Sequence, residues 1–277
     1  MSPHGAFGAR AAETATRRDF FAGVAAAAIA ATTSSESSAD TIGNADDVVV
    51  ELRQYTLRKG QRDTLIALFE EKFVAPQNDL GARIIGTFRD LDDPDRFVWL
   101  RGFRDMAVRK RSLEAFYGGP VWRDHRGAAN ATMVDSDNVL LLRPAGEGQG
   151  LAASSEPPGT THVIGARIHY LDTVDPERFA SFFERSVRPR LADMGVRPIA
   201  RFITEGAANN FRLPIREHER VYVWFARWNS LRDEEDFSAR WSALSGWRDD
   251  APEAILAGLM RKPERLRLAP TASSALR

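Results

Sequence analysis

Charged and aromatic side chains recur at every second position in two segments of the first half of this chain. Alternate side chains of an extended strand share one face, so each set would be presented on one surface. Guanidinium groups and aromatic rings on such a surface can bind an anionic or aromatic organic molecule. The candidate ligand-binding residues of this half are Glu51, Arg53, Tyr55, Trp99 and Arg101.

The second half offers a similar set on its own expected strands. Its candidate ligand-binding residues are Arg167, Tyr222 and Trp224. His169 shares a face with Arg167 and is a candidate catalytic residue, because an imidazole can act as a general base near neutral pH.

His125 is the other candidate catalytic residue. On a helical wheel it lies within an apolar stripe, which predicts that its side chain points inward. Three roles stay open: a hydrogen-bonded core histidine kept neutral by burial, a general base, or a haem ligand. Haem is therefore the one cofactor that these residues bring into consideration. The stripe consists of Val121, Trp122, Ala128, Ala129 and Thr132.

Burial of several arginines would cost several kcal/mol each unless the guanidinium groups are paired or hydrated. A bound anion would compensate this cost. Two alternatives need no ligand: Glu51 pairs with Arg53 or Arg101, or water fills the space around them.

Composition excludes several classes of function. The formal net charge is zero, from 38 basic and 38 acidic side chains, so there is no basic excess to neutralise nucleic-acid phosphates. Cysteine is absent, which excludes disulfides, thiolate nucleophiles and cysteine zinc sites. No phosphate-binding loop, hydrolase elbow or His-Glu-x-x-His motif occurs, and no metal site is predicted. The acidic run 233–236 predicts a helix start, and the basic run Arg109-Lys110-Arg111 predicts a solvated face.

Large aromatic residues recur 125 positions apart, which indicates one structural unit used twice. Two like units that pack together can enclose a cavity between them. The matching pairs are Phe97 and Tyr222, Trp99 and Trp224, Phe103 and Trp228, Phe116 and Trp241, and Trp122-Arg123-Asp124 with Trp247-Arg248-Asp249.

Hydrophobic periodicity predicts the order β-α-β-β-α-β in both units, which is the order of a ferredoxin-like fold. The first unit, 47–144, has expected strands at 48–57, 83–89, 96–103 and 138–143, and helices at 61–80, 105–118 and from Pro120. The second unit, 161–270, has expected strands at 163–171, 196–204, 220–228 and 265–268, and helices at 175–193, 231–244 and 252–260.

Two irregular segments interrupt this pattern. Residues 145–160 are rich in Gly, Ser and Pro and are expected to form a linker between the units. Residues 205–219 form a long excursion where the first unit has a tight turn, and loops that lengthen on a fixed scaffold often shape the mouth of a binding site.

The first 39 residues have the layout of a twin-arginine export signal. Arg17-Arg18 precedes a short apolar run, 22–31, and Ser37-Ser38-Ala39 suits a signal peptidase. The apolar run is too short to span a bilayer core of ~30 Å. We therefore expect the twin-arginine machinery as a partner and a soluble periplasmic or extracellular protein after cleavage. The alternative is a tail with two chance arginines.

The chain resembles the NIPSNAP family at two motifs. The first is Val49-Val50-Glu51-Leu52-Arg53-Gln54-Tyr55 with Leu57 and Gly60, and the second is Trp122-Arg123-Asp124-His125-Arg126 with Ala129-Asn130. The resemblance covers 48–144 and is weaker over 162–270, where Asp250-Ala251 replaces His125-Arg126. A site that requires this histidine would therefore exist once.

This resemblance implies an α+β fold in which two ferredoxin-like sheets face each other as a dimeric α+β barrel, here within one chain. Strand alternation then gives two faces per strand, and we expect Val50 and Leu52 to pack under the helices. The opposite face, which carries the candidate residues above, would line the barrel interior.

Three functions follow as hypotheses. The first is binding of a small organic molecule, anionic or aromatic, between the repeats. The second is an oxygenase-like or haem-dependent enzyme, as in other members of the wider superfamily, with His125 or His169 at its centre. The third is a non-catalytic interaction protein of the cell envelope, whose cavity would be filled by its own side chains. A homo-oligomer is compatible with all three, and fold analogy alone does not choose among them.

Overall fold

The computed structural model describes residues 47–152, 162–244, 251–259 and 261–277. All of them belong to one compact unit of the chain. The expected export signal and the motif Trp247-Arg248-Asp249 lie outside the described residues. Within the described ranges, no helix is long and apolar enough to cross a membrane. We call 47–152 the first half and 162–277 the second half.

Eight antiparallel strands close into one barrel in the order β1-β3-β2-β8-β5-β7-β6-β4. The first half supplies the order β4-β1-β3-β2 and the second half supplies β8-β5-β7-β6. Contacts of β2 with β8 and of β4 with β6 join the halves. The strands are β1 (Val49–Leu57), β2 (Arg83–Asp90), β3 (Arg96–Phe103), β4 (Met133–Pro144), β5 (Val163–Tyr170), β6 (Ala200–Thr204), β7 (Val221–Trp228) and β8 (Glu264–Pro270).

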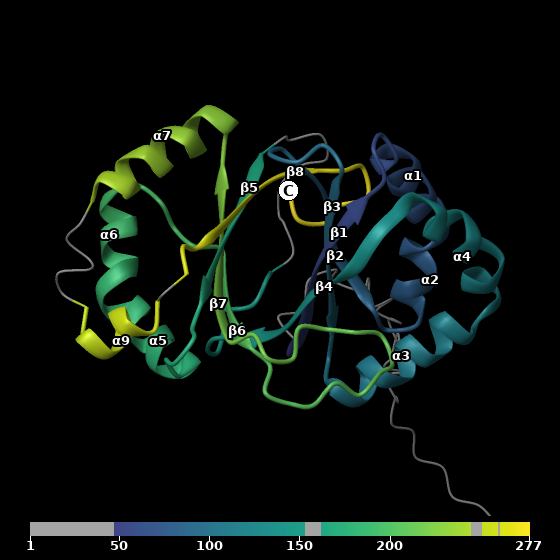
Figure 1. Ribbon diagram of the computed structural model, residues 1–277, viewed down its shortest axis with the longest axis horizontal. Helices are drawn as coiled ribbons and strands as arrows, with labels where there is room; N and C mark the ends of the chain where they lie inside the picture. The colour runs from purple at the N-terminus through teal and green to yellow at the C-terminus, as the bar shows by residue number, and fades with distance from the viewer. Residues whose placement is uncertain (1–46, 153–161, 245–250, 260) are drawn as a thin grey trace, which may run out of the picture. The chain divides into compact units, whose positions relative to one another are not determined.

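Each half covers its own strands with its own helices (Figure 1). Acceptor side chains at the N-caps fix where three of these helices begin: Asp105 accepts from the N–H of Val108, Asp175 from that of Arg178, and Ser230 from that of Asp233. The first half has α1 (Arg62–Lys72), α2 (Val74–Asp79), α3 (Met106–Gly118) and α4 (Pro120–Thr132). The second half has α5 (Pro176–Phe182), the π-helical turn η1 (Phe183–Val187), α6 (Arg188–Asp193), α7 (Leu231–Ala243) and α9 (Glu253–Ala257).

Two expected long helices are interrupted, and proline explains both interruptions. The helix expected over 61–80 breaks at Phe73, ahead of Pro76, and the helix expected over 175–193 contains η1 ahead of Pro189. A proline inside a helix lacks the N–H for the usual bond and its ring crowds the carbonyl four residues earlier.

The described part of the expected linker packs against the protein. Leu151 is buried among residues of the central core, and the N–H of Ala145 donates to the carbonyl oxygen of Arg201. Strand β4 also begins earlier than expected, because Met133 already pairs with Leu57 of β1.

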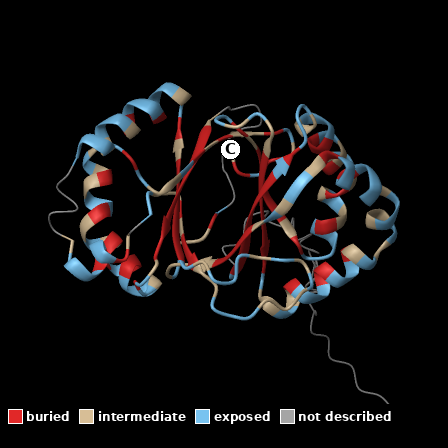
Figure 2. Ribbon diagram, viewed as in Figure 1, coloured by how far each residue is buried: buried red, intermediate tan, exposed pale blue. Residues whose placement is uncertain are grey.

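The barrel interior is an apolar core, which corrects the expected assignment of faces. Side chains of all eight strands meet there, and most are fully buried (Figure 2). An eight-stranded barrel is just wide enough for side chains to fill it. Its members include Val50, Leu52, Val98, Leu100, Leu140, Leu142, Ile164, Ala166, Ile168, Phe202, Val223, Phe225, Leu266 and Leu268.

The charged and aromatic sets instead lie between the strands and the helices. Trp99 packs on Phe69 of α1 with ring centroids 4.8 Å apart, and Trp224 packs on Phe183 of η1 at 6.0 Å. Strand alternation therefore predicted correctly which residues share a face. The apolar face, however, lines the barrel interior, and the charged and aromatic face lies under the helices, which is the reverse of the expectation. The predicted ligand residues do not line a cavity inside the barrel.

Candidate functional site

Four charged side chains meet beneath the helices of the first half, and we call them the Glu51 cluster. Glu51 of β1 accepts hydrogen bonds from Arg53 Nη1 at 2.7 Å, Arg101 Nε at 2.8 Å and Arg109 Nε at 2.7 Å. All four side chains are at most 2% exposed. The alternative in which Glu51 pairs with the arginines of its own sheet is thus confirmed.

Arg109 shows where the interpretation of the basic run was wrong. It lies in α3 and is fully buried, whereas its neighbours Lys110 and Arg111 are exposed. Because α3 packs on β3, one residue of the run faces the sheet. Three consecutive residues on a helix span about 200° around its axis, so they do not all lie on a single solvated face.

The electrostatics of the cluster are dominated by the arginines. Burial on its own would raise the pKa of Glu51, but the charges of Arg101, Arg53 and Arg109 together hold it well below the ordinary value of 4.5. Among the described residues, Glu51 is the one carboxylate within 4.0 Å of these three guanidinium groups. The cluster therefore carries three positive charges against one negative charge.

Aromatic rings and one amide complete the surroundings. The guanidinium carbons of Arg53 and Arg101 lie 5.3 Å and 5.1 Å from the ring centroid of Trp99, within reach of a cation–π attraction. Arg101 Nη1 also donates to Gln77 Oε1 at 2.9 Å, and Arg53 Nε donates to the hydroxyl of Tyr55 at 3.1 Å. Each arginine is thus oriented by more than one partner.

A small cavity of about 30 Å³ adjoins the cluster, between the sheet and helices α1 to α4. This is room for one or two water molecules. Its wall includes two predicted ligand residues, Tyr55 and Trp99. The full lining is Tyr55, Leu65, Phe69, Phe73, Gln77, Trp99, Phe116, Tyr117, Trp122, Ala129 and Met133.

Nε1 of Trp99 and Nη2 of Arg109 are buried donors with no hydrogen-bond partner in the described part of the chain. A third donor without a hydrogen bond, Arg101 Nη2, lies 2.8 Å from Glu51 Oε2 as an ion pair. Buried donors are normally satisfied. The region therefore presents more donors than acceptors.

The second half reaches across to this site through the segment 205–219, visible in Figure 1 as the long loop beside α3. Arg109 Nη1 donates to Asn209 Oδ1 at 3.1 Å and to Asn210 Oδ1 at 2.7 Å. Phe211 stacks on the cavity residue Tyr117, with centroids 5.6 Å apart and planes at 29°. The long excursion thus contacts both the charged cluster and the cavity wall.

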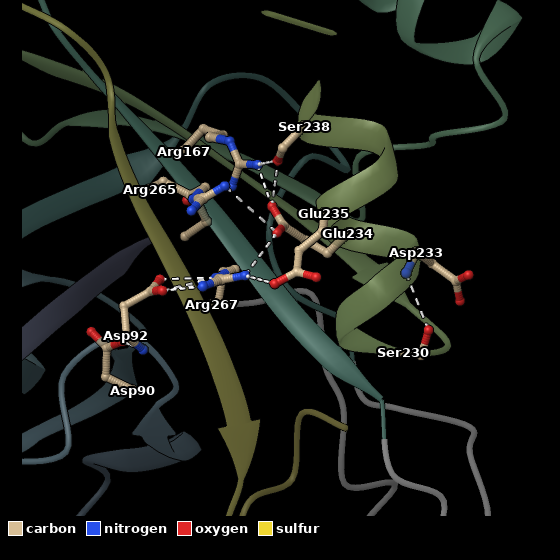
Figure 3. Close-up of polar contacts among 11 residues, drawn as sticks. Asp90, Asp92, Arg167, Ser230, Asp233, Glu234, Glu235, Ser238, Arg265 and Arg267 are labelled. Atoms are coloured by element: carbon tan, nitrogen blue, oxygen red, sulfur yellow. Dashed lines mark hydrogen bonds and ion pairs between the residues drawn. The ribbon is translucent and has the colours of Figure 1, made fainter. Parts of the chain in front are cut away.

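The second half has a strand-to-helix ion pair of its own with the signs reversed (Figure 3). Arg167 of β5 donates to Glu234 of α7 and, at 2.6 Å, to Ser238 Oγ. Glu234 lies 125 residues after Arg109 and is fully buried. The acidic run lies at the start of α7, as predicted, but Glu234 points toward the sheet and not toward solvent. Arg267 of β8 then links Glu235 with Asp92 of the first half.

No second copy of the Glu51 cluster occurs at the matching place in the other half. Glu51 pairs with Arg101 in the β1–β3 ladder, and the corresponding pair of β5 and β7 is Gly165 with Ala226. A Cβ on Gly165 would lie 2.3 Å from the ring of Trp228. An indole ring therefore fills the space that the charged groups occupy in the first half.

The two predicted catalytic histidines lie apart, one in each half. His125 is half-buried and does not line the cavity; its ring lies 6.4 Å from that of Phe73. His169 is 8% exposed, accepts from Trp224 Nε1 at 3.3 Å and packs on Phe179. In the described part of the chain both rings are packed against aromatic side chains, an arrangement that does not fit a haem, and we derive no step through one.

Residues 50–146 match the family model described as NIPSNAP. The whole Glu51 cluster lies within this NIPSNAP-matching part of the chain. A NIPSNAP-like domain protein from Burkholderia xenovorans is 27% identical, with 40% of this chain and 89% of that chain covered and a TM-score of 0.32. No curated protein matches the chain.

Solved structures with the same fold extend over both halves. A putative monooxygenase from Fusobacterium nucleatum covers 82% of this chain and 94% of its own, at 8% identity and a TM-score of 0.50. An anthrone oxidase-like protein covers 85% and 98%, at 12% identity and a TM-score of 0.50. The chain therefore shares its α+β barrel fold with these proteins.

Replacement of the central carboxylate should destabilise the protein strongly. Glu51→Gln leaves three buried guanidinium groups without a counter-charge, and we expect the free energy of unfolding to fall by about 3–5 kcal/mol. The matched control is Asp92→Asn, whose carboxylate pairs with Arg267 at a side-chain exposure of 37% and should cost at most about 1 kcal/mol. Urea denaturation measures both, and equal small losses would contradict a central role for Glu51.

The same variant has a pH signature. Because the pKa of Glu51 is lowered on folding, its contribution is present above the ordinary value of 4.5 and is lost as the pH falls towards the lower folded value. Between pH ~5 and ~3 the free energy of unfolding should therefore fall more steeply in the wild type than in Glu51→Gln.

The contribution of the contact between segment 205–219 and the cavity wall to stability can be measured separately. Phe211→Ala removes the ring stacked on Tyr117 and should lower the free energy of unfolding by about 1–2 kcal/mol. It should also quicken hydrogen exchange of the amides in α3, to which Asn210 is bonded through the carbonyl oxygen of Met106. Glu217→Ala, at an exposed position of the same loop, is the control and should change neither quantity.

Proposed function

We propose that the protein binds a small aromatic organic molecule in the cavity between the first-half sheet and helices α1 to α4. The observation that carries the proposal is the aromatic cavity that lies next to the buried Glu51 cluster in the first half. Binding sites usually combine an apolar, aromatic wall with a few placed polar groups. Here Tyr55, Gln77 and Trp99 supply the polar groups.

We also propose that the two halves are tandem ferredoxin-like repeats that build the barrel within one chain. Both halves run β-α-β-β-α-β and have corresponding strand orders. Phe97, Trp99 and Phe103 of β3 correspond at the same offset to Tyr222, Trp224 and Trp228 of β7. The second repeat then supports the first and binds no ligand itself, because Trp228 fills the space between its strands and helices.

The filled barrel interior bears on the choice between a ligand-binding protein and a non-catalytic interaction protein. A core packed with the protein's own side chains is what the interaction-protein hypothesis expects of the barrel, so the binding proposal rests on the helix-side cavity alone. At about 30 Å³, that cavity must widen to admit an aromatic ring. Half-buried Trp122 and Tyr117, which form part of its wall, are the side chains that would move outward.

Indole is a suitable neutral probe, followed by isothermal titration calorimetry. We expect the wild type to bind it with a dissociation constant of about 1 mM or lower. Ala129→Phe places a ring in the cavity from a position that is 1% exposed and should abolish binding. Val134→Phe, at a position that is 65% exposed, should leave binding unchanged. No heat of binding for indole or related aromatics would refute the proposal.

Oxygenase-like catalysis is the second candidate. It is favoured by the two solved structures with the same fold, one called a putative monooxygenase and the other anthrone oxidase-like. Uptake of dioxygen with conversion of a compound that binds in the cavity would favour catalysis over binding alone.

We further propose that the chain is exported by the twin-arginine route. The support is the sequence order of Arg17-Arg18, an apolar run and small residues. Changing both arginines to lysine should leave the protein in the cytoplasmic fraction of an export-competent host, whereas Arg10→Lys should not. Unchanged secretion of the double variant, read by immunoblot of cell fractions, would refute this route.

A further inference from the structure

We propose that the Glu51 cluster is the receptor for the acidic group of an aromatic carboxylic acid. The inference rests on the proposed function, because it assigns the chemical class of ligand to the same cavity. The aromatic body would lie among the rings of the cavity wall, and the carboxylate would lie beside Arg53 and Arg101.

The first argument is the charge of the cluster. Three guanidinium groups at most 2% exposed face one carboxylate, so the described residues leave an excess of two positive charges. Uncompensated buried charges are strongly unfavourable. A ligand carboxylate would remove part of this excess, and a neutral ligand would not.

The second argument is the imbalance of donors and acceptors. Both oxygens of Glu51 and the side-chain oxygen of Gln77 already accept hydrogen bonds from the arginines. In contrast, Trp99 Nε1 and Arg109 Nη2 have no partner in the described ranges. Tyr55 accepts from Arg53 Nε at 3.1 Å, so its own proton is directed elsewhere. The site is therefore rich in groups that donate to an acceptor.

The third argument is pre-organisation. Arg53 and Arg101 lie against Trp99, and Arg109 is held by Asn209 and Asn210 of the second half. Guanidinium groups fixed in this way lose little freedom when a ligand binds. A planar carboxylate matches the flat guanidinium fork and can accept two bonds from it.

Within the described residues, the matching place in the second half does not repeat the site. Gly165 and Ala226 stand where the first half has Glu51 and Arg101, and Trp228 packs over Gly165. We therefore expect one carboxylate to bind per chain.

The test compares benzoate with benzamide on the wild-type protein by isothermal titration calorimetry. The two probes have the same ring and nearly the same shape but differ in charge. We expect benzoate to bind with a one-to-one stoichiometry and at least about tenfold more tightly than benzamide. Equal affinities would overturn the carboxylate inference and leave the proposed function standing. Failure of benzoate, benzamide and indole alike would refute both.

Two variants separate binding from a purely structural role of the arginines. Arg53→Met should abolish the preference for benzoate and leave the ligand-free protein at least as stable as the wild type, because it removes one of three buried positive charges that share a single carboxylate. A large loss of stability would instead assign Arg53 to the structure. Tyr55→Phe is the milder change and should weaken benzoate severalfold; unchanged affinity in this variant would count against the proposed geometry.

Discussion

The contact between a buried carboxylate and a buried guanidinium, one on the sheet and one on a helix, is the interaction on which both halves of this protein depend. In the first half Glu51 lies on the strand and Arg109 on the helix. In the second half Arg167 lies on the strand and Glu234 on the helix. Because an unpaired buried charge is so unfavourable, each pair fixes how its helix must sit on the sheet.

The closed barrel explains why charged groups occur on this side of the sheet. The interior is packed mainly with aliphatic and aromatic side chains. The space beneath the helices is different, since a helix can bring a polar partner to a strand residue. Gln77, Arg109, Glu234 and Ser238 all fulfil this role.

The two halves share one arrangement of strands and helices but differ in the residues between the sheet and the helices. Where the first has Glu51 and Arg101, the second has Gly165, Ala226 and the overlying ring of Trp228. The second half also sends Asn209, Asn210 and Phe211 to the first. One half therefore holds the candidate site and the other closes the barrel and supports that site.

Much of this could be read from the sequence by itself. Strand and helix order, the residues that share a strand face and the NIPSNAP motifs are local or periodic properties, and the structure and the family match bear out these elements. Which face lies inside was decided only by the tertiary structure. Both faces of the sheet are buried, one in the barrel and one under helices, so hydrophobic pattern cannot separate them. The inward turn of Arg109 and the reach of Asn209 across the halves were equally hidden, because each depends on a partner distant in the sequence.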